Sequence, residues 1–67
     1  MQIQEELRVE AINDDGEAIL VRPNYRKVEY PLRWIPFSVK VGDVLNGIVH
    51  ECSKDTVSRI DFTGFAD

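Results

Sequence analysis

Apolar and polar residues alternate in short stretches along most of the chain. Leu7, Val9 and Ala11 alternate with Arg8 and Glu10, which is the two-residue period of a half-buried strand. The sequence NDDG follows at residues 13–16, and it predicts a hairpin turn with Gly16 at positive φ. Residues 17–22 (EAILVR) then predict the partner strand, and their more continuous apolar character favours a central place in the sheet.

Turn residues and prolines set the limits of the next segments. Residues 23–25 (PNY) predict a second turn, because proline fixes φ and asparagine tolerates the following position. Val28, Tyr30 and Leu32 alternate with Lys27, Glu29 and Pro31 and predict a third strand. Pro31 cannot donate a ladder hydrogen bond, so the end of this strand is expected at a sheet edge. The pattern breaks over residues 32–40, which predicts a single 3₁₀ turn there.

Two further strands are expected at about residues 43–52 and 56–62, joined by a turn at 53–55. Val57 is out of phase with Ile60 and Phe62, which predicts a β-bulge near residues 58–59. No helical period extends over ten residues. The sequence therefore predicts an all-β fold, a single domain over residues 1–67. We expect a small five-stranded barrel of SH3-like type, with an OB-like barrel as the alternative.

The only tryptophan, Trp34, lies between two prolines in the sequence YPLRWIPF. One connection in a five-stranded barrel must cross between sheets, and apolar side chains in that connection can plug the open end. Large aromatic side chains in small domains usually belong to the core. We therefore expect Trp34 to be a buried plug rather than part of a binding platform.

Charge is distributed unevenly along the chain, although the net value is −4. Residues 1–21 carry six acidic residues and one arginine, whereas residues 22–40 carry five cations and one glutamate. The basic part also contains tyrosines, and cations with aromatic rings are what small barrels use to bind single-stranded nucleic acids. The candidate partner-binding residues are Arg22, Tyr25, Arg26, Lys27 and Arg33.

Two functions are compatible with this basic turn. Four or five cations are a small footprint for phosphates on a chain with negative net charge, so we expect them to pair with the acidic N-terminal strand or to serve a protein partner. The expected function is a small non-enzymatic interaction module that binds another protein through a sheet edge or the basic turn. The alternative is a small barrel that binds single-stranded nucleic acid.

Few residues in the chain could support catalysis, metal binding or cofactor binding. His50 and Cys52 would lie on one face of a strand, but nothing marks a third orienting residue, and on an edge strand they are more often a polar surface residue and a small filler. His50, Cys52 and Asp55 lack the paired spacings of a zinc site. The four glycines are scattered at turns and form no phosphate loop. We expect no enzymatic activity, no metal and no cofactor.

The chain contains one cysteine, Cys52, no apolar run long enough to span a membrane, and a start without the features of a signal peptide. We therefore expect a cytoplasmic protein with no membrane partner.

Three segments carry a resemblance to a known family: INDDGEAIL at 12–20, YPLRWIP at 30–36 and VKVGDVL at 39–45. In them the chain resembles a family of short bacterial proteins of unknown function with a Val-Pro-Leu…Leu-Pro…Gly-Asp-Val-Leu pattern. The resemblance implies a small β-barrel and brings no established activity. The chain differs from the family pattern in its longer, more basic turn at 22–27 and in its C-terminal residues.

Overall fold

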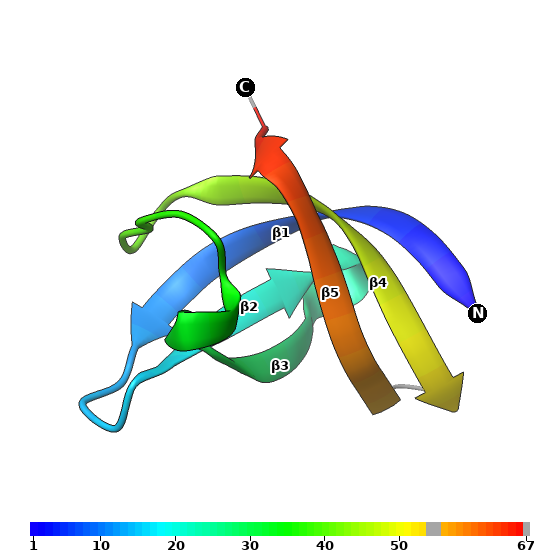
Figure 1. Cartoon of the computed structure of the whole chain (residues 1–67), viewed down its shortest axis with the longest axis horizontal. Helices are drawn as coiled ribbons and strands as arrows, with labels where there is room; N and C mark the ends of the chain where they lie inside the picture. Colours follow the sequence, from blue (N-terminus) through cyan, green and yellow to red (C-terminus); the bar gives the residue numbers. More distant parts are fainter. Residues whose placement is uncertain (54–55, 67) are drawn as a thin grey trace.

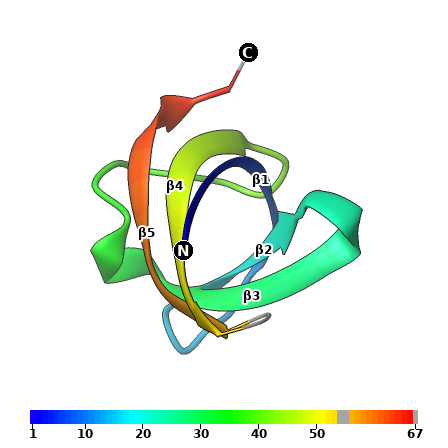
Figure 2. The ribbon, with the colours of Figure 1, turned by 90° about the vertical axis from the view of Figure 1, so that its right-hand side faces the viewer.

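Five antiparallel strands form one strongly curled sheet in the computed structural model, which describes residues 1–53 and 56–66 (Figure 1). The strands are β1 (Gln2–Ile12), β2 (Glu17–Arg22), β3 (Arg26–Pro31), β4 (Val44–Ser53) and β5 (Thr56–Phe65), and two 3₁₀ turns are η1 (Pro23–Tyr25) and η2 (Leu32–Trp34). Their order in the sheet is β3-β2-β1-β4-β5. Viewed from the side, the sheet curls into a half-barrel (Figure 2). The prediction of an all-β fold with five strands is confirmed.

Strand β1 forms the bend of the half-barrel by pairing with two strands in succession. Its residues Gln2 to Arg8 pair with β4, and Arg8 to Ile12 pair with β2. The register with β2 shifts between Val9 and Ala11, which marks a bulge at Glu10. The backbone of Val9 is hydrogen-bonded to the turn before β4, through Gly42 N and Asp43 O, each at 2.8 Å. The strand expected at residues 7–11 is longer because its first half pairs with β4, a partner that the local pattern does not indicate.

Several local predictions are confirmed. Gly16 has φ of +87° and closes the first hairpin by donating to the carbonyl of Asn13 at 3.1 Å. The 3₁₀ turn in the proline-bounded segment is η2. His50 pairs with Arg59 and Glu51 pairs with Val57, so Ser58 is the extra residue of the expected bulge. The turn expected at residues 53–55 lies partly outside the described residues.

The sequence patterns predicted the places of β2 and β3 in the sheet correctly, but not the place of β4. β3 is an edge strand and β2 lies between two neighbours, as predicted. β4 lies between β1 and β5, so the placement of His50 and Cys52 on an edge strand was wrong. Two of the four glycines, Gly47 and Gly64, lie inside β4 and β5 rather than at turns.

One hydrophobic core fills the concave side of the sheet. Its buried residues come from every strand and from the end of η2: Leu7, Val9, Ala18, Leu20, Tyr30, Ile35, Leu45, Val49 and Ile60. Trp34 is not among them, because 54% of its surface is exposed, and the prediction of a buried plug was wrong. A 3₁₀ turn has three residues per turn, so Leu32 and Ile35 face the same side and pack on the core, whereas Trp34 lies beside them.

Candidate interaction surfaces

Four of the predicted partner-binding residues belong to the turn between β2 and β3, and the fifth, Arg33, lies in η2. Arg22 ends β2 and continues the inward phase of Ala18 and Leu20, so its side chain enters the half-barrel and is buried. Arg26 begins β3 on the other side of the turn and is partly buried. The turn therefore places two arginines at one end of the half-barrel.

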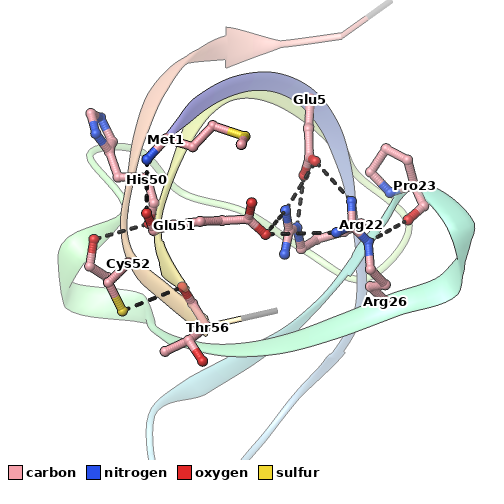
Figure 3. A network of polar contacts seen from close by, with 10 residues as sticks. Met1, Glu5, Arg22, Pro23, Arg26, His50, Glu51, Cys52 and Thr56 are labelled. Atoms are coloured by element: carbon pink, nitrogen blue, oxygen red, sulfur yellow. Dashed lines mark hydrogen bonds and ion pairs between the residues drawn. The ribbon is translucent and has the colours of Figure 1, made fainter. Parts of the chain in front are cut away.

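The two arginines meet two glutamates there, and the four side chains form an ion network of Glu5, Arg22, Arg26 and Glu51 (Figure 3). Arg22 binds both carboxylate oxygens of Glu5, with Nε to Oε1 at 2.8 Å and Nη2 to Oε2 at 3.1 Å. The same Nη2 donates to Oε2 of Glu51 at 2.9 Å. The positive charges of the two arginines and the negative charges of the two glutamates therefore cancel at this end of the half-barrel.

Arg26 completes the ion network from its rim. Its Nη2 donates to Oε2 of Glu5 at 3.2 Å, and its Nε donates to the carbonyl of Pro23 at 3.2 Å. For Arg22, its own hydrogen bonds to Glu5 are the largest cause that raises its pKa above the ordinary value. Every buried side-chain nitrogen and oxygen atom in the described part of the chain has a hydrogen-bond partner. The ion network thus meets the condition under which charges can be buried, full pairing with hydrogen bonds.

The other two predicted cations are also engaged. Nζ of Lys27 lies 2.9 Å from Oε1 of Glu10 on β1. The guanidinium of Arg33 lies 5.6 Å from the centre of the Trp34 ring, in the range of a cation–π contact. The expected pairing of the basic turn with the acidic first strand is therefore present for Arg22, Arg26 and Lys27.

Tyr25 projects into solvent from this turn, with 87% of its surface exposed. Both Asn24 and Tyr25 have positive φ, at 67° and 60°. Asparagine adopts this conformation readily, whereas a left-handed tyrosine costs about 1–2 kcal/mol. The three cations of the turn pair with glutamates of the fold, whereas the ring of Tyr25 extends into solvent.

Sequence reasoning missed the two glutamates of the ion network. Their signal is their phase: Glu5 precedes the buried Leu7 and Val9 at two-residue intervals, and Glu51 follows the buried Leu45 and Val49 in the same way. Strict alternation therefore points both carboxylates inward. Two carboxylates that point inward need cations that also point inward. Arg22 meets this condition, because it lies at a two-residue interval from the buried Leu20 in β2.

A second surface lies where β3 and β5, the two edges of the curled sheet, face each other. The hydroxyl of Tyr30 on β3 donates to the carbonyl of Ile60 on β5 at 3.2 Å and accepts from its N–H at 3.1 Å. One side chain thus satisfies both backbone groups of an edge residue. We call this junction the seam.

Five aromatic rings cross the seam and form an aromatic row. Successive ring centres are separated by 5.8 Å, 5.5 Å, 6.3 Å and 4.9 Å in the order Trp34, Tyr30, Phe62, Phe37 and Phe65. In the middle of the row Tyr30 is buried and the other two rings are half-buried, whereas Trp34 and Phe65 at its ends are 54% and 48% exposed. A shallow depression formed by residues 38–40, 42–44, 65 and 66 continues the surface beyond Phe65.

The two residues of the candidate catalytic pair, His50 and Cys52, each contact a different group. Nε2 of His50 lies 2.8 Å from Oδ2 of Asp61, and Sγ of Cys52 lies 3.7 Å from the carbonyl of Thr56. The hydrogen bond with His50 is the main cause that lowers the pKa of Asp61. Within residues 1–53 and 56–66, no three potential metal ligands converge. Asp55, the third candidate ligand, lies outside the described residues.

Comparisons with models of protein families, with characterised proteins and with solved structures find no match to this chain. The described residues contain no helix long and apolar enough to cross a bilayer. The fold and the two surfaces are therefore the basis for a functional proposal.

Proposed function

We propose that this protein is a small non-enzymatic interaction module that binds another protein at the seam, along the edge of β5. The observation that carries the proposal is the exposure of Trp34 and Phe65 at the two ends of one aromatic row. The two exposed ends are linked by buried and half-buried aromatic rings, and apolar side chains gathered on a surface mark interaction sites.

The residue types at the seam support a protein partner. Trp, Tyr and Arg dominate the energy of protein interfaces, and the ring of Trp34 contacts both the cation of Arg33 and the ring of Tyr30. β5 is also an edge strand of ten residues that pairs only with β4 among the described strands. Edge strands can accept an extended segment of a partner through main-chain hydrogen bonds, here at positions of β5 other than Ile60, whose N–H and carbonyl are bound to the hydroxyl of Tyr30.

Binding of single-stranded nucleic acid is the alternative function, with Tyr25 as the stacking ring. Its exposure and its left-handed backbone favour a displayed role. The cations around it favour it less, because Arg22 is buried against Glu5 and Glu51, and Lys27 is paired with Glu10. A phosphate would have to compete with these carboxylates.

Affinity capture from a lysate of the organism that encodes the protein tests the proposal, with Trp34→Ser and Phe65→Ser compared against Tyr25→Ser. All three side chains are about half exposed or more, so we expect each variant to fold, as checked by circular dichroism. We expect partner proteins to be captured by the wild type and by Tyr25→Ser, and to be lost with either substitution in the aromatic row.

The alternative is tested on the same variants by fluorescence anisotropy with labelled single-stranded oligonucleotides. Capture that is unchanged by Trp34→Ser and Phe65→Ser contradicts a partner site at the seam. Micromolar oligonucleotide binding at physiological salt that is lost with Tyr25→Ser would establish the alternative instead.

A further inference from the structure

An acidic turn lies directly beside the exposed end of the aromatic row. The backbone N–H of Leu32, at the start of η2, donates to the carbonyl of Gly16 at 2.9 Å. Glu17 pairs with Pro31 in the ladder between β2 and β3. These backbone contacts hold the first hairpin turn, which carries Asp14 and Asp15, next to the 3₁₀ turn that carries Trp34.

The carboxylates of this turn are available to a partner. No ion pair within the described residues involves Asp14, Asp15 or Glu17, and both aspartates are exposed. By contrast, the cations of the turn at 22–27 are neutralised by Glu5, Glu10 and Glu51. The hairpin turn beside η2 therefore presents the exposed carboxylates of Asp14 and Asp15, and Arg33 is the cation that lies next to Trp34.

Trp34 adds an attraction for cations of its own. The face of an indole ring attracts guanidinium and ammonium groups, and Arg33 already occupies such a position at 5.6 Å from the ring centre. Because 54% of the Trp34 surface remains exposed, a lysine or arginine of a partner can make a second contact of this kind.

From these contacts we infer that the seam binds a cationic extended segment of a partner protein. Apolar side chains of the segment pack on Trp34 and Phe65, and its lysine or arginine head groups pair with Asp14 and Asp15. This inference rests on the proposed protein-binding function and adds the chemistry of the partner. Charge complementarity of this kind sets specificity and the rate of association.

Other occupants of the seam are opposed by the same charges. A second copy of this chain carries the same net charge of −4 and would place one acidic turn near another unless a cation intervened. An acidic segment or a nucleic acid would meet Asp14 and Asp15 as like charges. A cationic segment is the occupant that the charges around Trp34 favour.

The test uses three blocked octapeptides of alternating sequence, in which leucine alternates with lysine, glutamine or glutamate. Binding to the full chain is followed by peptide anisotropy and by the emission of Trp34, the only tryptophan. We expect the lysine peptide to bind at least about tenfold more tightly than the glutamine peptide, and the glutamate peptide to bind most weakly. The preference should decrease as salt screens the exposed charges.

A double variant, Asp14→Asn with Asp15→Asn, removes two carboxylates while keeping residues that suit a turn. Its matched control is Glu6→Gln with Glu29→Gln, which changes the net charge equally at two exposed strand positions. The hairpin variant should weaken binding of the lysine peptide by about five- to tenfold, and the control by less than twofold.

The outcomes separate the chemistry of the partner from the existence of the site. Equal binding of the glutamine and lysine peptides, or equal losses in the two double variants, overturns the inference and leaves a protein-binding seam in place. Absence of any peptide binding also overturns it, and the proposed function is then judged by the capture experiment with Trp34→Ser alone.

Discussion

At the scale of single residues, the most consequential side chain is Arg22. It is 3% exposed at the end of a strand and contacts both Glu5 and Glu51. A buried ion pair of this kind need not stabilise the fold more than apolar residues of similar volume would. Removal of one partner is costly, however, because it leaves a buried charge without compensation.

Arg22→Ala should reduce the free energy of unfolding by about 3–5 kcal/mol. This is a large part of the roughly 3–10 kcal/mol expected for a domain of this length, so the variant should be partly unfolded at room temperature. The control is Lys27→Ala, which removes an exposed ion pair and should cost less than about 1 kcal/mol. Urea denaturation measures both. Equal losses in the two variants would show that the ion network does not stabilise the fold as described.

At the scale of secondary-structure elements, close packing and the seam decide how the strands are held. A Cβ atom added to Gly47 on β4 would lie 2.8 Å from Cγ2 of Ile60 and 3.3 Å from the carbonyl of Asp61, so β4 and β5 approach each other where only glycine fits. On its other side, β5 meets β3 through the hydroxyl of Tyr30. The hydroxyl of Tyr30 thus takes the place of the backbone hydrogen bonds that a neighbouring strand would make to Ile60.

Tyr30→Phe removes only that hydroxyl and leaves the N–H and the carbonyl of Ile60 without their partner. The loss should destabilise the protein by about 1–3 kcal/mol and should accelerate amide hydrogen exchange at Ile60. Tyr25→Phe is the matched control, because the ring of Tyr25 is exposed, and it should change neither quantity. An unaltered exchange rate at Ile60 in Tyr30→Phe would mean that the seam is closed by packing alone.

At the scale of the whole molecule, charge is divided between an internal balanced set and an external acidic set. The ion network neutralises itself inside the half-barrel, while the exposed carboxylates of the hairpin contribute to the net charge of −4. Two further carboxylates hold surface elements together. Asp43 accepts from the backbone N–H of Lys40 at 2.8 Å, which lowers its pKa, and His50 lowers the pKa of Asp61.

These lowered pKa values predict loss of stability in acid. The ordinary value for both carboxyl groups is 3.8, and the folded protein holds them below it. Their contribution is therefore fully present above about pH 4 and is lost as the pH falls through the lower folded values. Urea midpoints measured from pH 6 to pH 2 should fall less steeply in Asp61→Asn than in the wild type. A parallel decline in both proteins would contradict a role for Asp61.

The local pattern determined most of the secondary structure. Alternation in β1 and β3, the turn chemistry of Gly16 and the phase change at Ser58 are short-range properties, because a turn or a bulge depends on a few adjacent residues. The pairing of the basic turn with acidic residues of β1 was also expected from charge. The particular partners were not predicted, because Glu5 and Arg22 are 17 residues apart and Glu51 is a further 29 residues along the chain.

Only the tertiary structure decided which aromatic residues are exposed. Composition favoured a buried Trp34, but the curl of the sheet brings Tyr30, Phe37 and Phe62 into the seam, and Ile35 takes the inward position of the 3₁₀ turn. The room left for the largest side chain depends on how β3 and β5 approach each other across 30 residues of sequence, from Tyr30 to Ile60. The approach of β3 to β5 cannot be read from a local sequence pattern. The amino-acid sequence therefore specified the strands and their turns, while the packing between the two sheet edges placed Trp34 at the surface.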